Sequence, residues 1–420
     1  MRFFLAVIVI LFFQSCSGPQ KLSNQNLAYL YSTDLNFIYP EYKVYNLTED
    51  SSRVFFRINP NELLFMKSSS DGIFKSAFAI NYRLLPNYES KIPVDTGTMY
   101  FTRELLEDST LLILDEFDVR APDSNNYVLE ITLTDLNRKQ AVSSFLTVDR
   151  TGIQPAEDFI IVDPETNMPY VKNYTDRRST FKILNYNSTR RKLFVRYFND
   201  KYPLSTPPFS NAQIKPLSYF ADAVSVIDLD STNTITLEKT GIYHFQFDTL
   251  VKEGFTVFRF EEDFPKLTSA ENLIESIRFL TTRQEYDKIV NSSNKKEAVD
   301  DYWLAMAGNR ERARVLIRSY YSRVQSANLL FTSYLEGWKS DRGLIYIIFG
   351  PPNTVYRTND TENWNYSQTF NYGPLNFTFE KIKNPFTSND YLLRRSTYYE
   401  MPWYRAVDSW RDGRVVNDNY

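Results

Sequence analysis

Apolar and polar positions alternate with a period of two through the N-terminal part of the chain. Residues 54–58, 78–82, 111–114 and 127–133 are short segments rich in β-branched and aromatic side chains, and turn residues separate them. Successive side chains of a strand point to opposite faces, so this pattern indicates strands with one buried face. Residues 37–150 are therefore expected to form a β-sandwich.

A second block, residues 151–263, repeats this plan with strand-like segments at 181–184, 193–198, 234–237 and 241–247. Each block ends with a tyrosine, Tyr127 or Tyr243, that opens an alternating strand, followed by one last strand. This resembles the tyrosine corner of Ig-like sandwiches, in which the phenol bonds a nearby backbone group. We predict two tandem Ig-like β-sandwiches; a single larger irregular sandwich is the alternative.

The period changes to that of a helix at Thr268, and residues 264–335 are predicted to be helical. Thr268 with Glu271, and Thr282 with Glu285, fit capping boxes, and Gly308 is a helix stop. Apolar residues then recur with helical spacing to residue 331, which predicts the longest helix. Its arginines are expected to form a solvated face, with binding of an acidic partner as the alternative; they are Arg310, Arg312, Arg314, Arg318 and Arg323.

A motif of glycines, aromatic residues and prolines follows this helix. It runs from Gly337-Trp338-Lys339-Ser340-Asp341-Arg342-Gly343 through an apolar stretch, 344–349, to Gly350-Pro351-Pro352. Trp364-Asn365-Tyr366 and Phe377-Thr378-Phe379 come next. We expect residues 344–349 to be a strand that Gly350, Pro351 and Pro352 end, since proline cannot continue a ladder.

This order of residues resembles the GWxTD-domain family of bacterial proteins, with Ser340 standing where the family has threonine. The resemblance covers roughly residues 264 to 420 and implies an α+β domain, with a helical part at 264–335 and a small antiparallel sheet within 336–420. It implies no activity.

We interpret the motif as structural rather than catalytic. Gly337 is expected to adopt a positive φ after the long helix, and Trp338 to fill the gap between helix and sheet. Ser340 and Asp341 are expected to cap turn N–H groups. The remaining motif residues are assigned to the same structural set: Gly343, Gly350, Pro351, Pro352, Trp364 and Tyr366.

The N-terminus reads as a bacterial lipoprotein signal. Arg2 precedes an apolar run, 3–13, and then the only cysteine of the chain, Cys16. The run is shorter than the roughly 18 residues that a membrane span needs. We predict cleavage after residue 15, lipidation of Cys16 and a tether at 16–36. A buried free cysteine behind an ordinary signal is the alternative.

Composition argues against several kinds of chemistry. The formal net charge of −3 gives no basic excess for nucleic acid, and His244 is the only histidine. Metal-ligand spacings, phosphate-binding loops and nucleophile motifs are absent from the sequence, so neither a cofactor nor a metal is expected. A glycosidase pair of carboxylates remains open, with candidates Asp341, Asp360, Glu362 and Glu380.

Taken together, these patterns predict a non-catalytic, lipid-anchored scaffold of the outer membrane. The residues after Cys16 lack the acidic cluster that accompanies surface export in Bacteroidetes lipoproteins, which this N-terminus resembles, so the periplasmic face is favoured. The expected partner is an outer-membrane assembly, secretion or gliding-motility complex, and the membrane itself through Cys16. Two alternatives stay open: a glycan-binding or glycan-hydrolysing envelope lipoprotein, and a surface-exposed adhesin.

Overall fold

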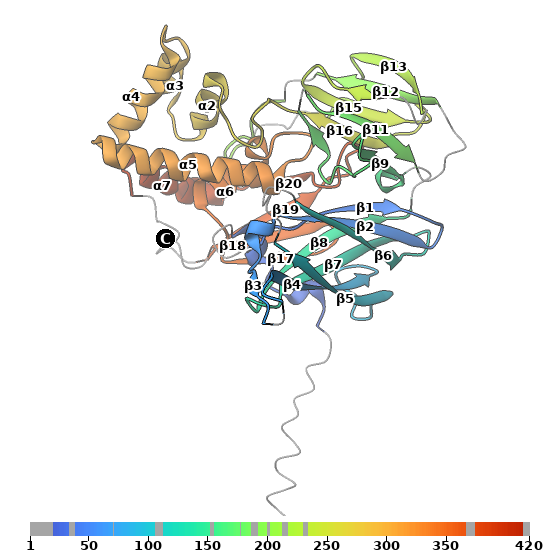
Figure 1. Ribbon diagram of the computed structural model, residues 1–420. Helices are drawn as coiled ribbons and strands as arrows, with labels where there is room; N and C mark the ends of the chain where they lie inside the picture. The colour runs from blue at the N-terminus through green and yellow to red at the C-terminus, as the bar shows by residue number, and fades with distance from the viewer. Residues whose placement is uncertain are drawn as a thin grey trace, which may run out of the picture.

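Figure 1 shows the computed structural model of the chain: two β-rich units and a C-terminal part that holds the long helices. Cys16 lies outside the described residues, so its lipidation stays a prediction. The described residues are 20–32, 38–69, 71–105, 112–151, 155–176, 178–185, 192–199, 202–211, 217–229, 234–366 and 374–414.

The first β unit is a sandwich of two antiparallel sheets. One sheet has the order β1-β2-β6, and in the other β3-β4-β7-β8 are joined by β5, which pairs with β4. Phe56 and Phe78, from opposite sheets, meet edge to face at 6.2 Å in the shared core. The strands are β1 Glu41–Asn46, β2 Ser51–Ile58, β3 Met66–Lys67, β4 Phe74–Leu85, β5 Asp95–Glu104, β6 Ile113–Arg120, β7 Asn126–Asp135 and β8 Gln140–Asp149.

The second β unit is also a sandwich. Its larger sheet has the order β10-β16-β15-β12-β13 and its smaller sheet β14-β11-β9. Phe159, Phe181 and Phe245 lie in the core between them. The strands are β9 Phe159–Val162, β10 Tyr174–Thr175, β11 Thr180–Asn185, β12 Lys192–Phe198, β13 Ala223–Asp228, β14 Ile235–Thr236, β15 Gly241–Gln246 and β16 Phe255–Arg259.

Both tyrosine corners predicted from the sequence are present. The Tyr127 hydroxyl donates to the Pro122 carbonyl at 2.9 Å, and the Tyr243 hydroxyl donates to the Lys239 carbonyl at 3.0 Å. Each phenol ties its strand to the backbone a few residues upstream, as in Ig-like sandwiches.

The helical segment begins one residue later than predicted. Ser269 rather than Thr268 caps α2, accepting from the Asn272 amide, while Thr268 bonds Asp263. The capping box of Thr282 and Glu285 is confirmed. The elements are α2 Ala270–Ser276, η6 Ile277–Phe279, α3 Arg283–Val290, α4 Lys295–Ala307 and α5 Arg310–Phe331.

The stop after α4 and the long helix α5 are confirmed. Gly308 takes a φ of 75° in the left-handed region that glycine favours. Along α5, Ile317 is partly buried, and the other apolar residues of the predicted helical spacing are buried: Ala313, Tyr320, Val324, Ala327 and Phe331. Arg323 is half-buried, with its guanidinium 5.1 Å from the Trp410 ring. The other four arginines are exposed: Arg310, Arg312, Arg314 and Arg318.

The prediction of a strand at 344–349 is wrong, because these residues belong to helix α6, Asp341–Phe349. Ser340 caps α6, with its hydroxyl accepting from the Gly343 amide at 3.1 Å. Every residue of α6 is buried, so no polar face interrupts its apolar run. A short run of this kind has no visible period and does not distinguish a buried strand from a buried helix. Gly350, at a φ of 82°, ends the helix.

A four-stranded antiparallel sheet, β17-β18-β19-β20, packs against these helices. The strands predicted around Trp364 and Phe377 are β18 and β19, and these two residues pair directly. The last helix of the described chain is α7, which buries Trp403, Ala406 and Trp410. The bounds are η7 Gly337–Lys339, β17 Thr354–Arg357, β18 Thr361–Tyr366, β19 Leu375–Lys381, β20 Tyr391–Leu393, η8 Thr397–Tyr399 and α7 Glu400–Arg411.

Residues 20–32, predicted to belong to a tether, instead form a packed segment that we call the N-terminal strap. It contains two short turns, η2 Leu22–Asn24 and η3 Ala28–Tyr31. Leu22 is buried against the first sandwich, and Leu27 and Tyr31 enter the core of the helices and the small sheet. The Leu27 amide donates to the Val355 carbonyl of β17 at 2.8 Å. The strap therefore covers an edge strand whose backbone groups would otherwise be exposed.

Candidate functional site

Two motif glycines allow three segments to approach each other closely. A Cβ on Gly337 would lie 1.9 Å from the Ala327 carbonyl oxygen of α5, and a Cβ on Gly343 would lie 2.0 Å from the Gly337 carbonyl oxygen. The expected positive φ at Gly337 is wrong, since its φ lies outside the left-handed region. Gly337 is required by the close approach of η7 to α5.

The tryptophan of the motif is fully buried in the same core. Trp338 lies beside Phe279 of η6, with ring centroids 6.3 Å apart, and its amide donates to the Asn328 side chain at 3.1 Å. Pro351 is partly exposed and Pro352 is buried, directly after the Gly350 that ends α6. The prolines therefore follow a helix, and the predicted role of ending a strand is wrong.

Glu362 of β18 is the centre of a buried polar network. Its carboxylate accepts from Arg342 at 3.2 Å, from Arg357 at 3.3 Å and from the Trp364 indole at 2.8 Å. The Tyr31 hydroxyl of the N-terminal strap donates to the same carboxylate. These donors compensate the charge of the Glu362 carboxylate, and the carboxylate compensates the charges of the two arginines. Any of these charges would be costly to bury alone.

The two arginines decide the ionisation of Glu362. Burial by itself would raise the pKa of this carboxyl, but Arg357 and Arg342, with bonds from Tyr31 and Trp364, lower it below its ordinary value. Burial raises the pKa of the Tyr31 phenol, so this hydroxyl stays protonated as a donor. The network therefore holds a charged carboxylate inside the domain.

Asp341 of the motif joins the domain to the second sandwich. It accepts from the Leu393 amide at 2.7 Å and from Arg395 at 2.6 and 3.0 Å. Arg395 also donates to Thr206, in the segment between β12 and β13. Asp341 was predicted to cap turn amides; instead, its bonds reach the β20 amide and a guanidinium.

The four candidate glycosidase carboxylates fall into two classes. Asp341 and Glu362 are buried and bound to arginines, whereas Asp360 and Glu380 are exposed, and Glu380 pairs with Arg394. The motif aromatics cannot stack on a sugar from solvent, since their rings are fully buried: Trp338, Trp364 and Tyr366. This arrangement does not favour the glycan alternative.

His244 of β15 is buried on the face of the second sandwich that Phe386 covers, with ring centroids 5.4 Å apart. Its Nδ1 lies 2.8 Å from the Thr256 hydroxyl and its Nε2 lies 3.1 Å from the Lys252 carbonyl. Burial lowers the pKa of His244 to about 4, so the ring is neutral at neutral pH. Both ring nitrogens are used in local contacts of the sheet.

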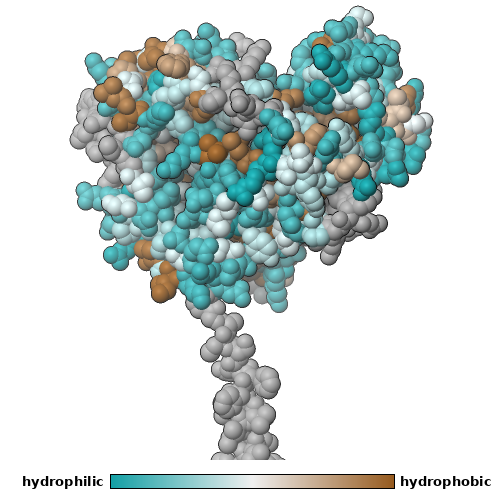
Figure 2. All heavy atoms as spheres, turned by 180° about the vertical axis from the view of Figure 1, so that it is seen from behind, coloured by the Kyte–Doolittle hydropathy of each residue, from teal (hydrophilic) through white to brown (hydrophobic). Residues whose placement is uncertain are grey.

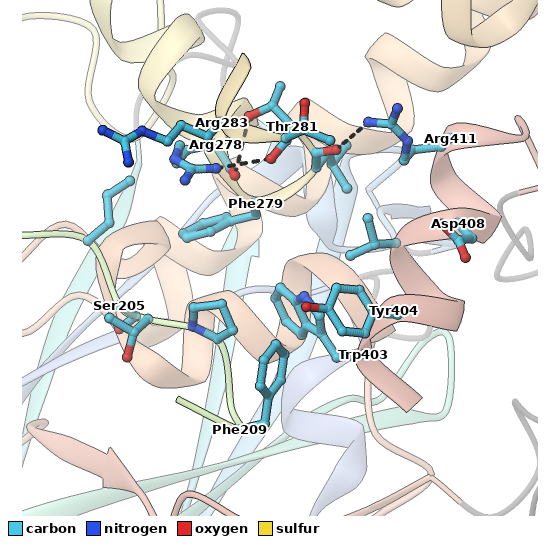
Figure 3. A pocket seen from close by; sticks show the side chains of 16 residues that line it. Ser205, Phe209, Arg278, Phe279, Thr281, Arg283, Trp403, Tyr404, Asp408 and Arg411 are labelled. Atoms are coloured by element: carbon cyan, nitrogen blue, oxygen red, sulfur yellow. Dashed lines mark hydrogen bonds between the residues drawn. The ribbon is translucent and has the colours of Figure 1, made fainter. Parts of the chain in front are cut away.

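Three elements from different parts of the chain enclose a cleft of about 610 Å³ (Figure 3). Residues 204–209 come from the second sandwich, residues 278–283 join η6 to α3, and α7 forms the third wall. The apolar lining residues are Leu204, Pro207, Phe209, Phe279, Leu280, Trp403 and Val407, and the charged ones are Arg278, Arg283, Asp408 and Arg411. A mostly apolar hollow of this volume between domains is typical of ligand and partner sites.

The sequence predictions missed the cleft and the arginines of the network. Arg342 is 20 positions from Glu362 and Arg395 is 54 positions from Asp341, whereas Arg357 meets Glu362 as its cross-strand partner in the β17–β18 hairpin. The sequence held one signal of the N-terminal strap, whose Tyr31 joins this network. It is the apolar run from Leu27 to Tyr31, which is unusual for a solvated tether.

Two features are absent from the described residues. None of their helices combines the length and the apolar character that crossing a membrane requires. Within the same residues, no three side chains of histidine, cysteine, aspartate or glutamate gather as a metal site would need.

Comparison with known proteins gives one family. A family model described as the GWxTD domain matches residues 241–412, beginning in β15 of the second sandwich. A comparison with curated proteins found no match. The solved structure titled "Biofilm associated protein - BSP domain" is 11% identical to this chain, with a TM-score of 0.18. The comparison covers 52% of each chain, and a likeness at this level supports no conclusion about fold or function. The motif, its α+β domain and the match together identify residues 241–412 of this chain as a GWxTD domain.

Proposed function

We propose that this protein is a lipid-anchored scaffold of the bacterial outer membrane that binds a partner protein through its GWxTD domain. The lipid would be carried by Cys16, on the periplasmic face. The partner would be an assembly, secretion or motility complex of that membrane. The protein would contribute binding surfaces rather than catalysis.

The packing of the N-terminal strap is the observation that carries this proposal. The strap contacts both the first sandwich and the small sheet: the Ser23 amide donates to the Tyr88 carbonyl, and the Leu27 amide donates to the Val355 carbonyl. Four residue steps separate Cys16 from Gln20, where the described chain begins. Fully extended, they reach about 14 Å. An anchor at Cys16 would therefore hold the body close to the bilayer.

The second sandwich and the GWxTD domain also meet over a packed interface. Phe386 lies against Phe198 at 4.8 Å and against His244 at 5.4 Å, and the Ser205 amide donates to the Lys339 carbonyl at 3.2 Å. Contacts of this kind favour a body with a fixed shape. Such a body presents its binding surfaces in one orientation, as a scaffold requires.

Fractionation of cells that carry Cys16→Ser tests the anchor. The variant should leave the membrane fraction for the soluble periplasmic fraction, because two or three acyl chains supply the membrane affinity. Ser17→Ala is the matched control and should stay with the membrane. Retention of Cys16→Ser in the membrane fraction would contradict lipid anchoring.

Affinity purification from gently solubilised envelopes tests the scaffold role. The wild-type protein should be recovered with a membrane-protein complex in a fixed stoichiometry. Recovery of the protein alone under several detergents would count against that role.

A further inference from the structure

The cleft beside α7 has an apolar base made by rings from all three of its walls. Phe209 contacts Tyr404 with ring centroids 5.4 Å apart, and Phe279 and Trp403 line the interior (Figure 3). Tyr404 is 49% exposed, so one wall is open to solvent. The hollow is large enough for one or two apolar side chains and would bury most of their surface.

One cation at this cleft has no acidic partner among the described residues. Arg278 is half-buried; its guanidinium lies 5.3 Å from the Tyr286 ring and donates to the Thr281 carbonyl at 3.0 Å. The other two lining arginines have carboxylates nearby: Arg411 pairs with Glu285 at 2.7 Å, and Arg283 lies 3.8 Å from Asp287. Arg278 is therefore the lining arginine that is placed to receive an incoming carboxylate.

The apolar surface continues beyond the cleft along the outer face of α7. Met401 is 59% exposed and lies one turn before Tyr404, and Tyr398 just before the helix is 62% exposed. A ligand the size of one acyl chain would fill only the hollow. A polypeptide segment covers the hollow and this strip together, which favours a peptide over a lipid.

We infer that the cleft binds a polypeptide segment of a partner protein that inserts an aromatic or aliphatic side chain and places a neighbouring carboxylate on Arg278. The inserted side chain packs on Phe279 and Trp403. The carboxylate forms a charge-assisted bond with the guanidinium, which is stronger where water is partly excluded. This inference rests on the proposed scaffold function and names the chemistry of its partner.

Selection from a random peptide display library tests the inference. The target is the full chain with Cys16→Ser, so the result does not depend on lipidation. Enriched peptides should carry an aromatic or large aliphatic residue beside Asp or Glu. Arg278→Gln should weaken the binding of a selected peptide about tenfold. The same peptide with Asn or Gln in place of its acidic residue should bind the proteins with and without Arg278→Gln equally well.

Two further variants separate this site from general effects. Val407→Trp fills the hollow and should abolish binding of the selected peptides, whereas Arg314→Gln, an exposed arginine on α5, should leave binding unchanged. Thermal unfolding of each variant identifies any that fail to fold.

The inference is overturned if no peptide is enriched, if enrichment survives Val407→Trp, or if palmitate binds the cleft while peptides do not. A failure of Cys16→Ser to leave the membrane would instead contradict the anchor and leave the cleft untouched.

Discussion

The second sandwich and the GWxTD domain bury ionisable groups in opposite ways. The sandwich buries His244 on the face of its larger sheet that Phe386 covers, and burial lowers the pKa of this ring to about 4, so the ring is neutral at neutral pH. The GWxTD domain encloses Glu362, whose pKa is lowered below the ordinary value by Arg357 and Arg342, so its core holds charges. The stability of the sandwich therefore depends on His244 staying unprotonated. The stability of the domain depends on each buried charge of the Glu362 network keeping its partners.

This difference predicts that the largest effect of a single substitution lies at Glu362. Glu362→Gln leaves Arg342 and Arg357 buried without a counter-charge and should lower the free energy of unfolding by about 3–5 kcal/mol. Denaturant unfolding measures the loss. Glu380→Gln removes an acid from an exposed pair with Arg394 and should cost under about 1 kcal/mol. Equal losses in the two variants would contradict the comparison.

Acidification should weaken the sandwich through His244. The unfolded chain binds a proton below the ordinary histidine pKa of 6.5, whereas the folded ring does not until about 4. The contribution of His244 to the free energy of unfolding is therefore complete above pH 6.5 and is lost as the pH falls. The loss is about 2 kcal/mol at pH 5. Unfolding curves at pH 7 and pH 5 measure this loss, and His244→Asn should reduce it. A wild-type loss that persists fully in His244→Asn would contradict a role for this ring.

The strap contributes one hydroxyl to the charged core. Tyr31→Phe keeps the ring but removes a donor to Glu362, and should lower the free energy of unfolding by about 1–2 kcal/mol. Tyr100→Phe, at a tyrosine that is 76% exposed, is the control and should change little. Denaturant unfolding that shows no difference between the two would mean that the hydroxyl is dispensable.

The two tyrosine corners should differ slightly in how much stability is lost when the hydroxyl is removed. Tyr127 is buried, so Tyr127→Phe leaves the Pro122 carbonyl without its donor and should cost about 1 kcal/mol. The Tyr243 bond to Lys239 is exposed, and water replaces it in Tyr243→Phe, so a smaller loss is expected. Thermal unfolding of both variants measures the two losses of stability. A larger loss in Tyr243→Phe than in Tyr127→Phe would contradict this prediction.

The sequence allowed the regular parts to be predicted, because their rules are local. Strand alternation located β7 and β15, and the Thr282–Glu285 box located the start of α3. Helix α6 was misread as a strand because its polar face is missing. The complete network around Glu362 could not be predicted, since Tyr31 and Arg342 are brought to it by the fold.

The strap has a consequence for the order in which the molecule is completed. Tyr31 and Glu362 are separated by 331 positions along the chain, yet they share a hydrogen bond. During synthesis or export, the strap emerges early and has no docking surface until β17 and β18 follow. Closing a loop of this length is slow, so we expect the strap to dock after β17 and β18 have formed.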